Sequence, residues 1–318
     1  MLIYDKVIVD TSNLFYRVAA LYLKDLEQDT VNQLTKSNTV FAHYKSVIEG
    51  IRNQTLGEVC LLFDPMLSNG GMSNRLKIKE GYKTTRDKNS PTAQLRLDTL
   101  EKLYSEFIVD AQARISVYHD ITFEADDFAE KLTETGKCLM ITSDEDFARY
   151  LESGRVEMLT SGITINQDNI YTAEDFEAKH GFKPSIASVT FWKVLYGDVS
   201  DNVVGVFKDP STKVIRTASD EMMEIIKELG NGLMSLAEAK SQYYSGNGRF
   251  ERFASLLKLS NTERSYEKLL DLSDANFQII ESMLPRNSDI DVNKFKVKLD
   301  LTTNKPAKEK KFSLNRKA

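Results

Sequence analysis

The chain has 318 residues, of which 41% are hydrophobic and 28% charged, so it can bury a sizeable core and add a second, smaller lobe. No apolar run approaches the roughly 20 residues that span a bilayer, and Asp5 stands where a signal peptide would be apolar. These features argue against a membrane protein and predict a cytoplasmic one. Because the net charge is −5, any affinity for nucleic-acid phosphates has to come from local basic segments.

Five short apolar runs recur along the first half of the chain. They are KVIVD to residue 10, EVCLLFD to 64, RISVYH to 119, KCLMIT to 142 and RVEMLT to 160. Helical patterns lie between them, from about residue 12 and over 39–53, 91–107, 124–135 and 144–151. This alternation predicts an α/β fold with a central, mainly parallel sheet flanked by helices. Cys60 and Cys138 each lie inside an apolar run, which predicts buried core residues and neither a disulfide framework nor a zinc site.

Three regions are predicted along the chain. A sheet domain covers residues 1–180, a helical lobe covers 181–302, and a basic tail that we expect to be disordered covers 303–318. The boundary is placed where Gly181 and Pro184 interrupt the chain. Residues 66–90 are rich in glycine and basic residues and fit neither strand nor helix patterns. They predict a mobile insertion that leaves the sheet after its second strand.

Carboxylates follow the predicted strands repeatedly. The set consists of Asp10, Asp64, Glu124, Asp126, Asp127, Asp144 and Asp146 after strands, and Asp198 and Asp201 after a later helix. Ligands of open parallel sheets bind outside the carboxyl ends of the strands, so these side chains are predicted to converge at one edge. Each residue alone has an ordinary explanation in helix capping or turn chemistry. Together they repel strongly, which predicts bound cations or several protonated carboxyls.

The donor type narrows the choice of cation. Carboxylates without converging histidine or cysteine favour magnesium or manganese over zinc or copper. The three histidines, His43, His119 and His180, share no ligand spacing, and residues 142–154 lack the pattern of an EF-hand calcium loop. Two such ions, about 3.5 to 4 Å apart, can generate hydroxide and stabilise the leaving oxygen of a phosphodiester. The cluster therefore predicts phosphodiester hydrolysis.

Six segments make a more specific comparison possible. They are VDTSNLFYR (9–17), LLFDP (61–65), GYKTTRD (81–87), FEADDFAE (123–130), ITSDEDFARY (141–150) and LYGDVSDNVVGV (195–206). In order and spacing they resemble the flap endonuclease/5′–3′ exonuclease family, especially its bacteriophage members. The resemblance implies a PIN-like, resolvase-like 5′ nuclease fold with a helical arch and a helical C-terminal lobe that binds duplex.

The resemblance also implies roles for individual carboxylates. Asp10, Asp64, Glu124, Asp126 and Asp127 would serve a first metal ion. A second, weaker site would use Asp144, Asp146, Asp198 and Asp201. Mg²⁺ or Mn²⁺ would occupy both sites.

In the family, the segment that corresponds to the basic insertion forms the arch over the active site. By resemblance, Lys83 contacts the scissile phosphate, Arg86 clamps a phosphate with two hydrogen bonds, and Tyr82 stacks or packs. The remaining cations of the insertion are expected to contact nucleic acid, and they are Arg75, Lys77, Lys79 and Lys88.

After GDVSDN the chain departs from the family pattern, because Lys208, Asp209 and Pro210 replace later glycines of a hairpin that binds duplex and often potassium. This disfavours a potassium site, and we expect Lys208, Thr212 and Lys213 to contact the duplex through side chains and the start of a helix.

The resemblance implies a structure-specific 5′ nuclease acting on branched or 5′-ended DNA and RNA–DNA hybrid in primer removal, replication or repair. Two alternatives stay open. A PIN-like ribonuclease is disfavoured by the chain length, the insertion and the GDVSDN segment. A non-catalytic, structure-specific DNA-binding protein is disfavoured because unneeded clustered charge is costly to keep. We expect a monomer, with a single-strand-binding or other replication protein as a candidate partner.

Overall fold

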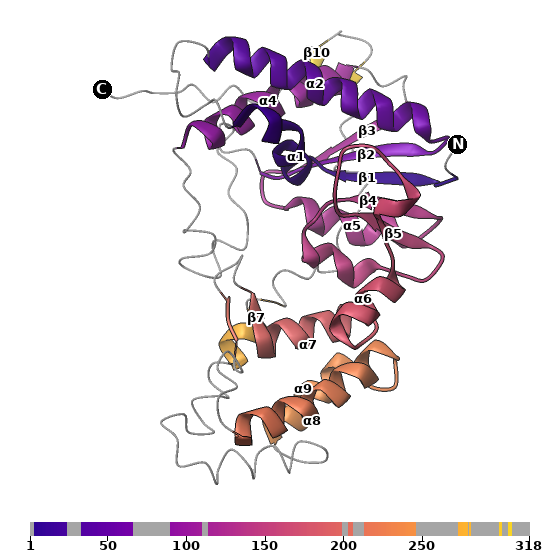
Figure 1. Cartoon of the computed structure of the whole chain (residues 1–318), viewed down its shortest axis with the longest axis vertical. Helices are drawn as coiled ribbons and strands as arrows, with labels where there is room; N and C mark the ends of the chain where they lie inside the picture. The colour runs from indigo at the N-terminus through magenta and orange to yellow at the C-terminus, as the bar shows by residue number, and fades with distance from the viewer. Residues whose placement is uncertain are drawn as a thin grey trace.

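A six-stranded sheet forms the centre of the protein (Figure 1). The structure, a computed structural model, describes residues 3–23, 33–65, 90–109, 114–198, 203–205, 213–245, 273–278, 280, 299–300 and 305–306. The strands are β1 (Lys6–Asp10), β2 (Glu58–Phe63), β3 (Ile115–His119), β4 (Cys138–Ile141), β5 (Val156–Leu159) and β6 (Ile170–Tyr171). Their order is β3-β2-β1-β4-β5-β6, and all pairs are parallel except β5 with β6. The predicted fold class and its five strands are confirmed.

Helices cover both faces of this sheet. On one face lie α1 (Thr11–Leu23), α2 (Gln33–Gln54) and α4 (Pro91–Val109). The other face carries α5 (Ala125–Thr133), the 3-10 helix η3 (Glu145–Tyr150), α6 (Ala173–His180) and α7 (Ile186–Tyr196). Beyond these come α8 (Lys213–Gly230) and α9 (Leu236–Ser245), which lie at the far end from α2 in Figure 1.

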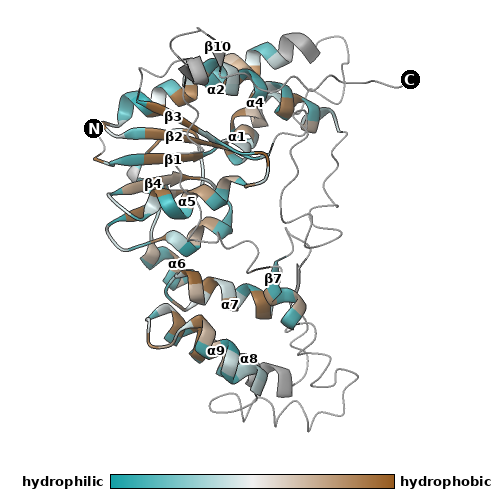
Figure 2. Cartoon of the chain, turned by 180° about the vertical axis from the view of Figure 1, so that it is seen from behind, coloured by the Kyte–Doolittle hydropathy of each residue, from teal (hydrophilic) through white to brown (hydrophobic). Residues whose placement is uncertain are grey.

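Successive side chains of the central strand β1 point to opposite faces of the sheet, and the buried core is divided into two apolar clusters, one on each face. Val7 and Val9 point into the apolar cluster under α1, α2 and α4, whereas Ile8 points into the cluster of α5, η3 and α7. All three are fully buried. A strand covered on both faces reads as a continuous apolar run, which is why this sheet was visible in the sequence. Figure 2 shows the hydrophobic colouring concentrated on these strands.

Short elements complete the described chain. They are the 3-10 helix η4 (Gln167–Asn169), the antiparallel pair β7 (Gly197–Asp198) and β8 (Val203–Val204), and the antiparallel pair β9 (Leu299–Asp300) and β10 (Lys305–Pro306). None of the helices in the described part of the chain combines the length and apolar character needed to cross a bilayer.

Some sequence predictions needed correction or were not tested. The helix predicted over 144–151 is a 3-10 helix over Glu145–Tyr150, with backbone hydrogen bonds three residues apart from Phe147 to Asp144 and from Leu151 to Ala148. The helix predicted over 39–53 begins earlier, at Gln33. One apolar cluster continues from the sheet into α7, α8 and α9, so the boundary near residue 180 stays a prediction. Cys60 and Cys138 are buried free thiols, as predicted. Residues 66–89, which hold almost all of the predicted arch, and most of the tail lie outside the described residues.

Candidate metal-binding site at the carboxyl edge of the sheet

Three of the predicted carboxylates lie where the strand order reverses. The chain proceeds from β1 to β2 and β3 on one side, then crosses to β4 and β5 on the other. Asp10 ends β1, Asp64 directly follows β2, and Asp144 follows β4 closely. Because these strands are parallel, their carboxyl ends meet at one edge, beside the switch point where α/β sheets bind ligands.

Asp10 is held by hydrogen bonds from two segments. Its Oδ1 accepts from the backbone N–H of Asn13 at 3.0 Å, within the first turn of α1. Its Oδ2 accepts from the Thr142 hydroxyl at 3.1 Å. Burial and the negative charges of Asp64 and Asp144 raise the pKa of Asp10 to about 7, although both hydrogen bonds oppose the shift. A cation beside Asp10 would relieve this repulsion.

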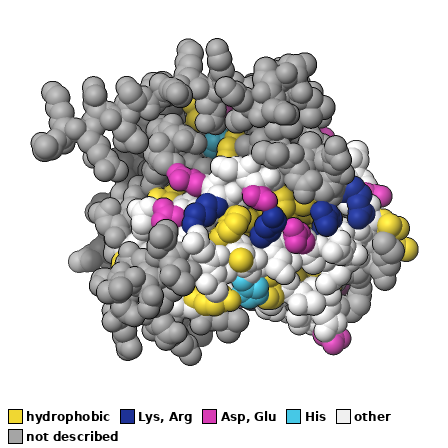
Figure 3. Space-filling view, turned by 90° about the horizontal axis from the view of Figure 1, so that it is seen from above, with side chains coloured by type: hydrophobic (Ala, Val, Ile, Leu, Met, Phe, Trp, Pro, Cys, Tyr) yellow, Lys and Arg dark blue, Asp and Glu magenta, His cyan; other side chains and the backbone are white. Residues whose placement is uncertain are grey.

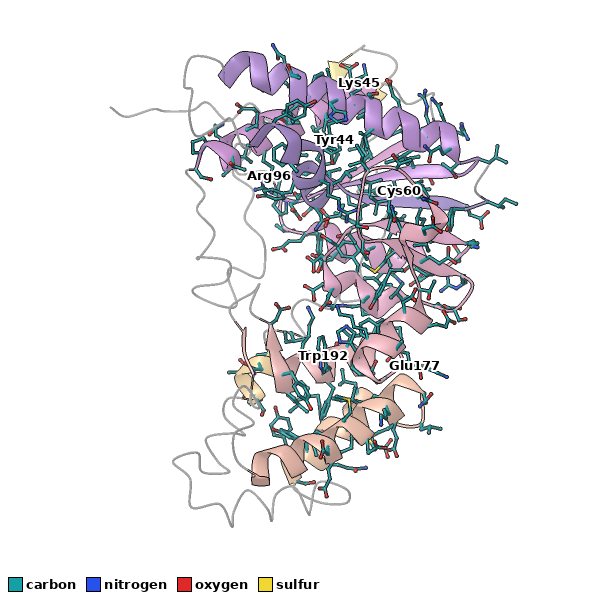
Figure 4. The ribbon with its side chains drawn as sticks, in the orientation of Figure 1. Tyr44, Lys45, Cys60, Arg96, Glu177 and Trp192 are labelled. Carbon is teal, nitrogen blue, oxygen red and sulfur yellow. The ribbon has the colours of Figure 1, made fainter. Side chains whose placement is uncertain are left out.

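Asp64 connects α1 with α5. Its Oδ1 accepts from the backbone N–H of Ala125 at 3.1 Å, and its Oδ2 accepts from the Ser12 hydroxyl at 2.7 Å. The guanidinium of Arg96 donates to the same hydroxyl through Nη1 at 3.2 Å. Arg96 lies near the start of α4, close to α1 (Figure 4). Its buried Nε has no hydrogen-bond partner among the described residues.

Three further carboxylates gather at the start of α5. Glu124 is the N-cap residue, and its backbone N–H donates to Oδ2 of Asp127 at 2.7 Å. Asp126 occupies the same first turn, and all three side chains are buried. Negative charge is favoured at a helix N-terminus by the helix dipole. Asp64 reaches this turn through Ala125, so the carboxylates after β2 and β3 belong to one connected group.

Asp144 belongs to the opposite side of the switch point. Its Oδ1 accepts from the backbone N–H of Asp146 at 2.9 Å, which starts η3. Its own N–H donates to the Thr142 hydroxyl at 3.1 Å, so Thr142 links Asp144 to Asp10. Burial and the charges of Asp146 and Asp126 raise the pKa of Asp144 to about 6, while the hydrogen bond and Lys193 oppose this rise.

Asp146 and Asp198 form a different arrangement, because buried cations neutralise them. The Asp146 carboxylate accepts from Arg149 Nη2 at 2.7 Å and from the Lys193 ammonium. The same ammonium donates to Oδ2 of Asp198 at 2.6 Å. All four residues are buried. Burial lowers the pKa of Lys193, but the charges of Asp146 and Asp198 outweigh it and hold this pKa above its ordinary value.

Sequence reasoning missed Arg149 and Lys193. Arg149 follows Asp146 by three residues, a spacing that brings side chains together on a helical turn. Lys193 is the lone charged residue in the apolar segment ASVTFWKVLY. A single lysine in such a segment is a signal for a buried ion pair, since lysine is almost never buried unpaired.

Several predicted residues cannot be placed. Asp201 and the predicted nucleic-acid contacts Arg75, Lys77, Lys79, Tyr82, Lys83, Arg86, Lys88, Lys208 and Thr212 lie outside the described residues. Lys213 begins α8, without a described side chain. The histidines contact other groups: His43 bonds Tyr22, His119 packs on Tyr104, and His180 stacks on Phe176 and lies 3.8 Å from a carboxylate oxygen of Glu145.

The donor set fits a hard divalent cation in chemistry, since burial and neighbouring carboxylates raise the pKa of Asp10 and of Asp144, and oxygen is the preferred ligand of magnesium. Over the described ranges, no three acidic, histidine or cysteine side chains are grouped tightly enough to hold a metal ion. Hydrogen bonds, Arg149 and Lys193 hold several of these carboxylates instead. A metal ion would therefore have to replace some of these contacts.

On the face nearest α2, lysine, arginine and acidic side chains intermingle (Figure 3). Lys45 there pairs with Glu106 at 2.5 Å, and Lys102 bonds Ser37 and Asn38. Among the described side chains visible on this face, no patch of one sign stands out.

Comparisons with known proteins agree with this fold. A family model described as 5′–3′ exonuclease, N-terminal resolvase-like domain, matches residues 5–181, more than half of the chain. The chain is similar to the phage T5 D15 protein co-crystallised with metal ions, with 19% identity and a TM-score of 0.50 over 88% of this chain and 89% of that one. At this identity the likeness shows a shared fold.

Two further T5 structures are similar over most of their length. One is T5 5′-exonuclease with bound zinc, at 17% identity and a TM-score of 0.47 over 88% of this chain and 100% of that one. The other is T5 D15 flap endonuclease with DNA and metal ions, at 17% identity and a TM-score of 0.46 over 87% and 99%. No curated protein sequence matches the chain.

Proposed function

The chain belongs to the 5′–3′ exonuclease family, and we propose that, as a 5′ nuclease, it cuts branched or 5′-ended DNA and RNA–DNA hybrid with Mg²⁺ or Mn²⁺. The family resemblance seen in the sequence is confirmed by this membership. Within the proposal, Asp10, Asp64, Glu124, Asp126 and Asp127 serve a first ion. Asp144, Asp146, Asp198 and Asp201 serve a second.

One observation carries the proposal. Asp10, Asp64 and Asp144 follow three adjacent parallel strands and repel one another, and this repulsion contributes to the raised pKa of Asp10. A folded protein that keeps such repulsion loses stability unless a ligand compensates for it. A divalent cation is the ligand that this set of oxygens would take.

The chain's own residues would orient the carboxylates for this task. Ser12 and the Ala125 amide hold the two oxygens of Asp64, while the Asn13 amide and Thr142 hold those of Asp10. Bound ions would activate water and stabilise the leaving oxygen.

The proposed phosphate contacts come from two segments whose side chains are not described. Lys83 and Arg86 would contact the scissile region, with Tyr82 beside them, and the other cations of the insertion would guide the strand. Lys208, Thr212 and Lys213 would contact the duplex. The GYKTTRD segment supports the first set by its resemblance to the family. We further propose a cytoplasmic monomer that works with a single-strand-binding or other replication protein.

Incubation with a 5′-labelled flap, a nicked duplex and an RNA–DNA hybrid, each with Mg²⁺ or with excess chelator, tests this function. We expect short 5′ products that require the metal. Cleavage of the RNA strand of the hybrid, with neither of the other two substrates cut, would favour the ribonuclease alternative. Junction binding without any cleavage would favour the non-catalytic one, and full activity in chelator would rule out metal dependence.

A further inference from the structure

The ammonium of Lys193 lies between two carboxylates that are far apart in the sequence. Asp146, 47 residues away, is in η3 on the sheet side. Asp198 is in β7, just beyond the end of α7. With only 4% of its surface exposed, Lys193 is shielded from solvent by the packing of α7 against η3. In this conformation the ammonium therefore interacts with these two carboxylates and not with solvent.

The backbone after α7 explains how Asp198 returns to this lysine. Gly197 has φ 85° and ψ 173°, a conformation that residues with a Cβ atom rarely adopt. The chain turns there, so that Asp198 comes back toward the helix and accepts from Lys193 at 2.6 Å. Glycine at this position thus allows a contact five residues along the chain that a continuing helix would not make.

The charges of this cluster balance. Arg149 and Lys193 supply two positive charges, and Asp146 and Asp198 supply two negative ones. A divalent ion that took an oxygen from each carboxylate would need them at about 2.1 Å. It would then lie within a few ångströms of the ammonium that already bonds the same two groups. Repulsion between the two cations in a buried setting makes joint occupancy unfavourable.

We propose that Lys193 is a positioning residue that holds Asp146 and Asp198 together in place of the second divalent ion, which binds only by displacing the Lys193 ammonium. The inference rests on the proposed function, in which these two carboxylates serve the second ion. It explains a weaker second site by direct competition with a tethered cation. It also assigns Lys193 a role other than contact with nucleic-acid phosphate, because both of its observed ionic partners are acidic.

Counting Mn²⁺ bound to the full chain without DNA, from the electron paramagnetic resonance signal of free Mn²⁺, tests the competition. Lys193→Met removes the competing charge, so we expect the second ion to bind about tenfold more tightly. Lys193→Arg keeps a cation and should keep weak binding. A matched control is Lys179→Met, because Lys179 pairs with Glu145 of the same 3-10 helix at 2.5 Å but is exposed. It should change Mn²⁺ affinity little.

The outcomes separate the inference from the proposed function. A purely structural role for Lys193 predicts weaker Mn²⁺ binding in Lys193→Met, and that result, or no change, would overturn the inference alone. An equal gain in Lys179→Met would also overturn it, since any lost positive charge would then suffice. Absence of Mn²⁺ binding to the wild-type chain would overturn both the inference and the proposed function.

A second measurement uses only the wild-type chain, in case Lys193→Met does not fold. In protein labelled with ¹⁵N at lysine side chains, a buried ammonium gives a protected cross-peak, which Lys193→Arg assigns by its loss. During Mg²⁺ titration we expect this peak to persist while the first ion binds and to disappear as the second binds. A peak unchanged with both ions bound would show that Lys193 stays in place and would refute the displacement.

Discussion

Both sides of the carboxylate edge carry buried or partly buried aspartates, but different groups stabilise the charge of these aspartates on each side. On the β1 and β2 side, Asp10 and Asp64 receive hydrogen bonds from hydroxyls and backbone amides, and no ion pair among the described residues involves them. On the α7 side, Arg149 and Lys193 neutralise Asp146 and Asp198. Within the described part of the chain, no ion pair therefore neutralises the first group, whereas the second group carries its own ion pairs. Residue type alone does not decide which carboxylate binds an added cation.

The largest expected effect comes from the β1 and β2 side, where the carboxylates have no ion pair among the described residues. Asp10→Asn should lower single-turnover cleavage by about 1,000-fold, because it removes a metal ligand whose charge stabilises the transition state. DNA binding should change only a few-fold, and thermal stability without metal should rise as repulsion with Asp64 and Asp144 is relieved. Asp168→Asn, in η4 and exposed, is the control for charge. Equal loss of rate in both variants would contradict a special role for Asp10.

Stability against pH sharpens the comparison further. The pKa of Asp10 is raised from 3.8 to about 7, so between about pH 4 and 7 the folded state binds a proton that the unfolded state has released. In chelator, stability should therefore fall as pH rises through this window and level off above it, by about 4 kcal/mol in total for Asp10 alone. Asp144 should add to the fall up to about pH 6.

Urea unfolding of the metal-free chain at pH 5 and pH 8 measures this difference. Asp10→Asn should remove the share of Asp10 and leave the shares of Asp144 and of Glu130, whose pKa burial also raises to about 7. Saturating Mg²⁺ should reduce the difference in the wild type because the ion compensates for the charge. A wild-type chain more stable at pH 8 than at pH 5 would reverse the sign and disprove the mutual repulsion.

How much of this was predictable from the sequence depends on the range of each contact. The strands were visible because β1, β2 and β4 are continuous apolar runs, and the strand-end position of Asp10 and Asp64 follows from those runs. Lys193 was not predicted, since its pairing with Asp146 depends on the packing of α7 against η3 across 47 residues. The contact of Arg96 with Ser12 was not predicted for the same reason, because 84 residues separate the two in the sequence.

On the α7 side, a change in the backbone at Gly197 is expected to alter the free energy of unfolding by less than the loss of the Asp10 charge does. Gly197→Ala should destabilise the fold by about 2 kcal/mol, because alanine is strained at φ 85° and ψ 173°. Gly50→Ala, within α2 where an added Cβ meets no atom within 4 Å, is the matched control and should stabilise by about 0.5 to 1 kcal/mol. Thermal or urea unfolding compares the two. A stabilised Gly197→Ala variant would mean that the turn toward Asp198 does not need glycine.

The smallest expected effect concerns the hydrogen bonds that connect Arg96 of α4, through Ser12, to Asp64. Arg96 donates to the Ser12 hydroxyl, which donates to Asp64, so we expect Arg96 to orient that carboxylate indirectly. Arg96→Met should slow single-turnover cleavage by about tenfold, which corresponds to about 1.4 kcal/mol. Ser12→Ala should have a similar effect, and the double variant should be little worse than either, because both substitutions interrupt the same contact chain.

Arg52→Met, on α2, serves as a charge control and should cleave at the wild-type rate. Fully additive losses from Arg96→Met and Ser12→Ala would show that Arg96 acts separately from Asp64, for example by contacting the nucleic acid itself.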